Sequence, residues 1–181
     1  LTYMMTMPGK KLLFMGCEFA QFREWDFENS LEWFMLRYPR HAEMQRFTAF
    51  LNHFYLDHKE LWEIDDDWDG FVWIDPDDAA ENVLSYRRID AAGHELIVLL
   101  NFAPVRRENF RLEVPTRGAY REVLASDEFR FGGGGTQNGT VRTVTEKTPD
   151  EKRHNYVTIT LPSNGAVILQ KVSASKANPS K

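Results

Sequence analysis

Side chains suited to ligand binding gather in one short segment near the start of the chain. Residues 11–25 read KLLFMGCEFAQFREW, and four of them are candidate ligand contacts: Glu18, Gln21, Arg23 and Trp25. Carboxylate, amide and guanidinium groups together donate and accept hydrogen bonds. An aromatic ring adds a flat face that packs on apolar surface. Because a sugar presents both hydroxyl groups and apolar C–H faces, these four residues are hypothesised to line a carbohydrate groove.

Structural interpretations compete with this hypothesis. Glu18 could serve only to pair with Arg23 and hold the loop. Trp25 stands among charged residues, so contact with a ligand and a plain surface position are both open. Trp33, within the segment LEWFML, is interpreted as core, because large aromatic side chains are usually buried.

The elements that position these residues follow from the apolar pattern. Residues 12–15 are all apolar, which is typical of a strand covered on both faces. Apolar residues then recur at helical spacing across residues 41–62, which predicts an amphipathic helix. A carboxylate directly after a buried strand stands where the loops of a (β/α) barrel carry their chemistry.

An acidic run at residues 65–70 separates this part from an all-β pattern. We interpret the run as a solvated linker and place a domain boundary there. Short apolar runs between turn residues then predict an antiparallel sandwich with strands at 71–74, 83–88, 95–101, 109–114, 120–124, 140–144, 156–161 and 166–172. The small, polar tail at 173–181 is predicted to be disordered.

Composition argues against several classes of function. The chain has 181 residues, a net charge of −5 and one cysteine. Its Lys and Arg residues are scattered along the sequence, which disfavours nucleic-acid binding. No apolar run approaches the roughly 20 residues of a membrane span. A single cysteine fits a reducing compartment.

Familiar site motifs are incomplete. Asp65, Asp67 and Asp69 match the start of an EF-hand loop, but Pro76 stands where the closing carboxylate is needed. The glycines at 132–135 lack the Lys-Ser/Thr end of a phosphate-binding loop and are predicted to form a flexible hairpin loop. The histidines have no zinc-site spacing. We therefore expect neither a metal nor a cofactor.

An ordered series of motifs resembles a known family. The segments are PGKKLLFMG at 8–16, EFAQ at 18–21, REW at 23–25, SLEW at 30–33, DGFVW at 69–73, NFAPV at 101–105, YREVL at 120–124 and LP at 161–162. Together they resemble the C-terminal part of bacterial glycogen branching enzymes, 1,4-alpha-glucan branching enzymes of the α-amylase superfamily. The resemblance covers nearly the whole chain.

The resemblance implies a particular fold. It is an α+β fragment, in which the last strand and helix of a catalytic (β/α)8 barrel at residues 1–64 precede a linker at 65–70. An all-β antiparallel sandwich follows at residues 71–172.

It also implies a function. The parent would be a cytoplasmic transferase that cleaves α-1,4 glucan links and re-forms them as α-1,6 branches. Its retaining chemistry needs two carboxyl groups about 5 Å apart. Those catalytic groups are expected upstream, so no catalytic residue is assigned here and the isolated chain is expected to be inactive. The expected partners are an alpha-glucan such as glycogen or amylose and the rest of the barrel.

Two departures from the family pattern affect the key loop. Cys17 stands where Asn is expected, and a thiol cannot replace an amide as both donor and acceptor. Phe22 stands where Gly is frequent, which restricts the backbone.

The alternative function is a stand-alone carbohydrate-binding or structural β-domain. Without neighbouring strands, residues 12–15 are expected to be exposed or to pair with a second copy.

Overall fold

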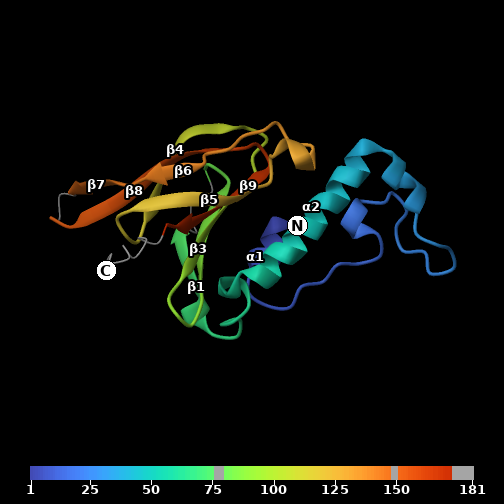
Figure 1. The fold of residues 1–181 in the computed structure, drawn as a ribbon, viewed down its shortest axis with the longest axis horizontal. Helices are drawn as coiled ribbons and strands as arrows, with labels where there is room; N and C mark the ends of the chain where they lie inside the picture. The colour runs from blue at the N-terminus through green and yellow to red at the C-terminus, as the bar shows by residue number, and fades with distance from the viewer. Residues whose placement is uncertain (76–79, 148–150, 173–181) are drawn as a thin grey trace, which may run out of the picture.

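The structure is a computed structural model that describes residues 1–75, 80–147 and 151–172. Most of these residues belong to an antiparallel all-β domain, and a long helix lies against one side of it (Figure 1). The tail at 173–181, which the sequence predicts to be disordered, lies outside the described residues.

The β domain is a sandwich of two sheets. The larger sheet contains, in spatial order, β1 (Phe71–Asp75), β2 (Val83–Ile89), β3 (Glu95–Asn101), β9 (Gly165–Lys171), β5 (Ala119–Ala125) and β6 (Thr140–Arg142). The smaller sheet contains β4 (Arg107–Val114), β8 (Arg153–Leu161) and β7 (Val144–Lys147). Every pairing is antiparallel. The predicted sandwich is confirmed, although the strand expected at 140–144 divides between the two sheets.

All but one of the helical segments among the described residues precede the sandwich, and η5 lies between β5 and β6. The α-helices are α1 (Thr2–Thr6) and α2 (Pro39–Asp57). Short 3-10 turns are η1 (Cys17–Phe19), η2 (Trp33–Arg37), η3 (Lys59–Leu61), η4 (Trp68–Gly70) and η5 (Phe129–Phe131). Pro39 occupies the first turn of α2, where its fixed φ suits a helix start and its missing N–H costs nothing. The helix predicted at 41–62 is confirmed in its main part, but it ends at Asp57.

The larger sheet is covered on both faces. One face packs on α1, α2 and η3 through a core that includes Leu51, Phe54, Leu96 and Val98. The other face packs on the smaller sheet through a second core, to which β3 contributes Ile97 and Leu99. Successive side chains of a strand point to opposite faces, so β3 must be apolar at both alternating sets of positions. This explains its uninterrupted apolar sequence.

No strand forms at residues 12–15. This segment is irregular, and the side chains of Leu12 and Phe14 are 75% and 48% exposed. A strand needs partners for its N–H and C=O groups, and the sheets among the described residues do not include this segment. The predicted barrel strand is therefore not formed in this chain, whereas the predicted exposure of the segment is observed.

The acidic run at 65–70 is not a fully solvated linker. Asp65 accepts a hydrogen bond at 3.0 Å from Arg88, whose side chain is completely buried. The same guanidinium donates to the backbone carbonyls of Thr6, Leu61 and Gly70 at 2.7, 3.1 and 3.2 Å. A buried guanidinium requires such partners. The interpretation as a solvated linker is thus wrong for Asp65.

The glycine-rich segment between β5 and β6 is an ordered loop rather than a flexible hairpin. The carboxylate of Asp127 accepts hydrogen bonds from the backbone N–H groups of Gly134 and Thr136, at 2.7 and 2.9 Å. A Cβ on Gly133 would lie 2.2 Å from the Asp127 carbonyl oxygen. Glycine is therefore needed at position 133, because the backbone of Asp127 approaches too closely to leave room for a side chain.

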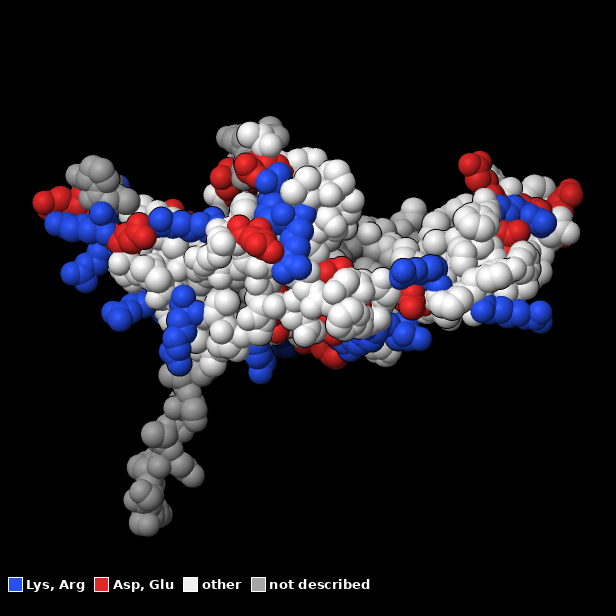
Figure 2. All heavy atoms as spheres, turned by 90° about the horizontal axis from the view of Figure 1, so that it is seen from above, with Lys and Arg blue, Asp and Glu red and all other residues white. Residues whose placement is uncertain are grey.

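Acidic and basic side chains are scattered among the other residues that make up most of the visible surface (Figure 2). At the end of the sandwich, on the left of the view, several Lys and Arg side chains project into solvent.

We predict that Arg88→Met lowers the free energy of unfolding by about 3–5 kcal/mol, because it leaves Asp65 and three backbone carbonyls without their buried donor. Urea unfolding followed by tryptophan fluorescence measures the loss. Arg111→Met is the control, since the Arg111–Glu146 pair is about half exposed and is worth about 1 kcal/mol or less. Equal losses in the two variants would contradict the central role of Arg88.

We further predict that the isolated 21.1 kDa chain self-associates through residues 12–15. Size-exclusion chromatography with light scattering should show a species larger than a monomer, and Leu12→Ser with Phe14→Ser should return it to the monomer. Val105→Ser, at a side chain that is 57% exposed, should have no such effect. A monomeric elution with residues 12–15 protected from hydrogen exchange is incompatible with this prediction.

Candidate functional site

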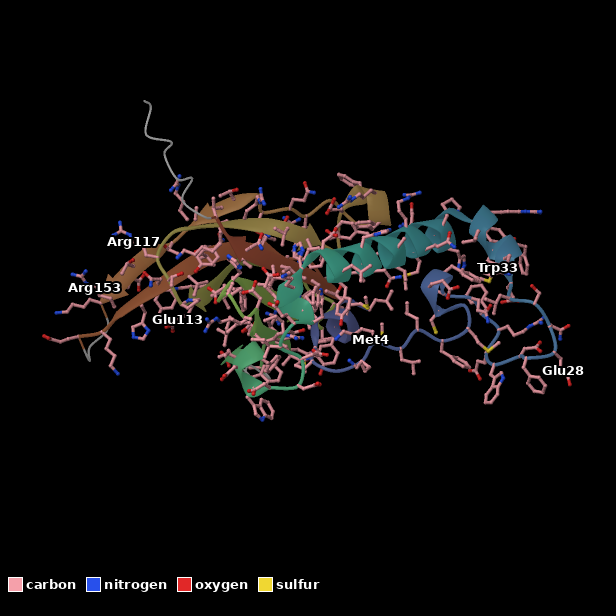
Figure 3. All side chains as sticks on the ribbon, turned by 60° about the horizontal axis from the view of Figure 1, so that its bottom comes forward. Met4, Glu28, Trp33, Glu113, Arg117 and Arg153 are labelled. Carbon is pink, nitrogen blue, oxygen red and sulfur yellow. The ribbon has the colours of Figure 1, made fainter. Side chains whose placement is uncertain are left out.

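The four candidate residues lie on one loop, which we call the 16–32 loop. It projects beyond the N-terminal end of α2, on the side away from the sandwich (Figure 1). Glu28 of this loop and Trp33 just after it lie at the opposite end of the molecule from Arg117 and Arg153 (Figure 3). The loop is therefore presented to solvent by α2 and not by the β domain.

Glu18 is positioned by η1, which α2 anchors. The hydroxyl of Thr48 donates to the Glu18 carbonyl oxygen at 3.0 Å, and Nδ1 of His41 lies 2.9 Å from the Phe19 carbonyl oxygen. The Phe19 side chain is completely buried. These contacts hold the backbone at Glu18 while its side chain remains partly exposed.

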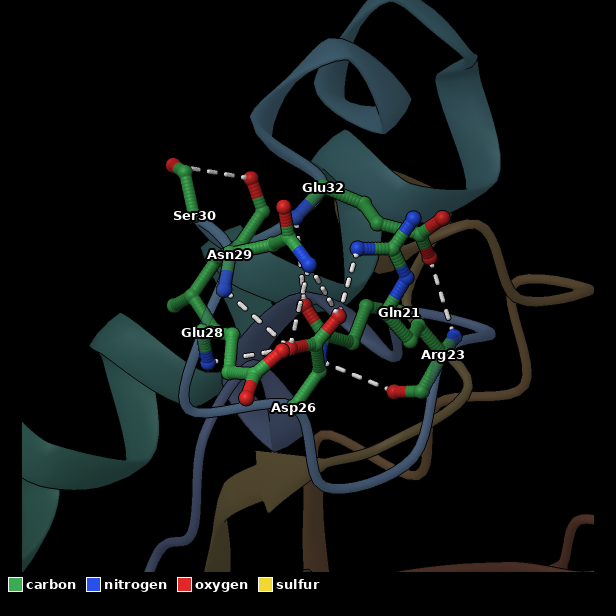
Figure 4. Close-up of polar contacts among 8 residues, drawn as sticks. Gln21, Arg23, Asp26, Glu28, Asn29, Ser30 and Glu32 are labelled. Carbon is green, nitrogen blue, oxygen red and sulfur yellow. Dashed lines mark hydrogen bonds and ion pairs between the residues drawn. The ribbon is translucent and has the colours of Figure 1, made fainter.

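The side-chain amide of Gln21 links two separate parts of the 16–32 loop. Its amide nitrogen donates to the Arg23 carbonyl oxygen at 2.9 Å, and its amide oxygen accepts from the Glu32 N–H at 3.2 Å. The Glu32 carboxylate accepts in return from the Arg23 N–H at 2.9 Å (Figure 4). Gly16, at φ +82°, lets the Gln21 side chain approach, since a Cβ there would lie 2.3 Å from the amide carbon. The amide of Gln21 thus maintains the shape of the loop.

Asp26 organises the tip of the loop. Its carboxylate pairs with the Arg23 guanidinium at 2.8 Å and accepts from the N–H groups of Glu28 and Asn29 at 3.0 and 3.1 Å. The side-chain amide of Asn29 donates to it at 2.9 Å and is the main cause of a lowered pKa at Asp26. The Glu18–Arg23 pair considered from the sequence is not formed, because Arg23 pairs with Asp26.

Sequence reasoning missed Asp26 and Glu32 as organisers of the loop. An Asp whose carboxylate accepts from the backbone two and three residues later forms a local turn. The spacing of Asp26 and Asn29 carries this signal, whereas the reach from Glu32 back to Arg23 has no local signature.

Trp25 is the candidate residue that the loop presents most openly. Its side chain is 72% exposed and makes edge-on contacts with Phe14 and Phe27, at centroid distances of 6.1 and 6.4 Å. Phe22 and Phe27 are 82% and 77% exposed. An exposed aromatic surface of this kind marks a binding site or a contact with another part of a protein.

Trp33 is not a core residue. Its side chain is 49% exposed, and one face rests on Phe19 at a centroid distance of 5.1 Å. The core interpretation of Trp33 is wrong because Phe19 and Met35 fill the buried positions beside α2. The second face of the Trp33 ring adds to the aromatic surface near the loop.

The structure describes residues 1–75, 80–147 and 151–172. These residues contain no group of three or more His, Cys, Asp or Glu side chains placed to hold a metal ion. No helix among them has the length and apolar character needed to cross a membrane.

Residues 73–172 match the family model described as the alpha amylase C-terminal all-beta domain, which is more than half of the chain. The chain belongs to this family. The match begins inside β1 and ends just after β9. The alpha-amylase C-terminal domain thus corresponds to the two-sheet sandwich.

The similarity to curated proteins extends beyond this alpha-amylase C-terminal domain. The chain is 40% identical to a 1,4-alpha-glucan branching enzyme of Halothermothrix orenii over 93% of its own length and 27% of that protein. It is 44% identical to the enzyme of that name from Aromatoleum aromaticum, over 92% of its length and 26% of the relative. The chain thus spans about a quarter of the length of these relatives.

A solved structure supports the fold. The crystal structure of an alpha-amylase from H. orenii superimposes with a TM-score of 0.56 at 16% identity, covering 94% of this chain and 34% of that one. Similarity at this level of identity concerns the fold alone.

We predict that the tip of the 16–32 loop loses order in acid. Because the folded pKa of Asp26 is below its ordinary value of 3.8, its carboxylate stabilises the tip above about pH 4. That stabilisation disappears as the pH falls through the lowered pKa. Hydrogen exchange at the N–H groups of Glu28 and Asn29, corrected for intrinsic rates, should show falling protection.

The control is Asp26→Asn, which should show weak protection at every pH. Protection of the wild-type tip that is unchanged in acid would refute this role of Asp26.

Proposed function

We propose that the chain is the C-terminal part of a 1,4-alpha-glucan branching enzyme, a transferase that cleaves α-1,4 glucan links and re-forms them as α-1,6 branches in glycogen synthesis. The observation that carries the proposal is identity of about 40% to branching enzymes over more than nine-tenths of the chain. A match over 93% of the 181 residues leaves out only about 13 of them, so it includes the 16–32 loop as well as the β domain, whereas the family model covers only residues 73–172.

The same proposal divides the chain into parts. Residues 1–64 are the end of a catalytic (β/α)8 barrel, residues 65–70 are a linker and residues 71–172 are the sandwich. The exposed apolar side chains at residues 12–15 support the first part, since they become the last barrel strand once neighbouring strands supply hydrogen-bond partners. Leu56 on α2, 66% exposed, would be covered by the same barrel.

The 16–32 loop then forms one edge of the active site, at the end of a barrel strand where such enzymes carry their chemistry. Trp25 stacks on a glucose ring of the substrate, and the partly exposed Glu18 offers hydrogen-bond acceptors to its hydroxyls. Gln21 and Arg23 hold the loop through their contacts with Glu32 and Asp26. The two reacting carboxyl groups lie outside this chain, so the chain alone is inactive. The enzyme acts in the cytoplasm on glycogen or amylose.

The alternative is a stand-alone carbohydrate-binding or structural β-domain. This alternative does not explain why residues outside the sandwich are also similar to branching enzymes, and it is the weaker proposal for that reason. A test that separates the two uses the full product of the reading frame that encodes this chain. Iodine absorbance of amylose should fall without new reducing ends, because each cleaved α-1,4 link is replaced by an α-1,6 link through the same anomeric carbon, so the number of reducing ends is conserved. Unchanged absorbance would favour the alternative.

Within that full product, we predict that Trp25→Ala lowers kcat/KM for amylose about tenfold, through the loss of about 1.4 kcal/mol of stacking in the transition state. The matched control is Trp68→Ala, which removes a side chain that is 82% exposed on η4. It should leave kcat/KM unchanged. Equal kinetics of the Trp25 variant and the wild type would exclude Trp25 from the substrate site.

A further inference from the structure

A cavity of about 1010 Å³ lies at the end of the larger sheet. Its walls come from the β2–β3 turn, the β4–β5 turn and the adjoining ends of β5, β6 and β9. It belongs to the β domain, and Arg117 on its wall lies at the opposite end of the molecule from the 16–32 loop (Figure 3). The cavity is therefore separate from the proposed glucan site.

Basic side chains dominate the wall of this cavity. The wall carries Arg87, Arg117, Arg121, Arg142 and Lys171, against the single carboxylate of Glu95. Glu95 is already paired with Arg87 at 2.6 Å. The four other cations have no ion pair among the described residues. The chain as a whole carries a net charge of −5, so this gathering of positive charge is local.

The strand register places two of these cations, Arg121 and Arg142, side by side on one face of the larger sheet. Arg142 of β6 lies opposite Ala119 of β5, two residues before Arg121, so the two guanidinium groups leave the sheet on the same face. Lys171, at the end of β9, lies opposite Tyr120 and reaches the cavity from the other face. The like charges of Arg121 and Arg142 repel each other, and an anion bound between them relieves the repulsion.

The uncharged polar groups on the wall are already engaged. The Gln170 amide donates to Glu60 at 3.1 Å, the Thr116 hydroxyl lies 2.9 Å from the Tyr120 hydroxyl, and the Gly118 N–H donates to Thr143 at 3.0 Å. The residues that line the cavity include no Trp, Tyr or Phe side chain on which a sugar ring could stack, and the one imidazole, that of His94, is engaged with Asp90 at 2.9 Å. These features disfavour a neutral sugar and leave charge as the means of recognition.

We propose that this cavity binds a small anionic ligand that carries at least two phosphate groups. Three guanidinium groups match the planar geometry of phosphate oxygens, and Lys171 adds a compact point charge. The volume exceeds the needs of a single phosphate, which would leave most of the four cations unneutralised.

Isothermal titration of the full product with inorganic pyrophosphate, at low ionic strength, tests the proposal. We expect saturable binding with one site per chain, and weaker binding of inorganic phosphate. The double variant Arg121→Gln with Arg142→Gln should weaken pyrophosphate binding roughly tenfold or more. Arg117→Gln, on an exposed turn where folding is not at risk, should weaken it to a smaller extent.

The control variant is Lys10→Gln with Arg37→Gln, which removes the same charge far from the cavity and should change the affinity less than about twofold. Added maltotriose should not displace pyrophosphate, which distinguishes this cavity from the glucan site. Absence of saturable binding, equal affinity for phosphate and pyrophosphate, or an equal loss in the control variant would each overturn the proposal.

Discussion

The guanidinium of Arg88 joins segments that are far apart in sequence. From β2 it reaches α1 at Thr6, η3 at Leu61, Asp65 and η4 at Gly70. Asp65 in turn accepts from the Gly9 N–H at 3.0 Å. Because an unpaired charge in this interior would cost several kcal/mol, these contacts form together or not at all. They fix α1, η3 and η4 against the sandwich, beside the core through which Leu51 and Phe54 hold α2 on the same face of the larger sheet.

Coverage of the larger sheet on both faces is the second constraint. The central strands β3 and β9 supply apolar side chains to both cores, whereas β4 and β7 of the smaller sheet alternate or are largely exposed. Such a layered arrangement gives the molecule a rigid centre. The two surfaces with a proposed role, the 16–32 loop and the basic cavity, lie at opposite ends of that centre.

The two surfaces are held in different ways. The loop depends on local carboxylate and amide contacts, so its shape responds to single residues such as Asp26 and Gln21. The basic cavity depends on strand register, because Arg142 and Lys171 approach the neighbourhood of β5 only when β6 and β9 pair with it. The 16–32 loop is therefore shaped by contacts between residues close in sequence, whereas the basic cavity requires the whole larger sheet to form.

The sequence by itself determined the strands, the main helix and the likeness to branching enzymes. Alternation and turn residues report local geometry directly, and β3 has the predicted bounds 95–101. Only the tertiary structure decided that Asp65 is half-buried and paired with Arg88, that Trp33 is exposed and that residues 12–15 lack a strand. The first two outcomes depend on contacts between residues far apart in sequence, as with Thr6 and Arg88 at a separation of 82 residues. The third depends on neighbouring strands that the chain does not supply. Local periodicity carries no information about such partners.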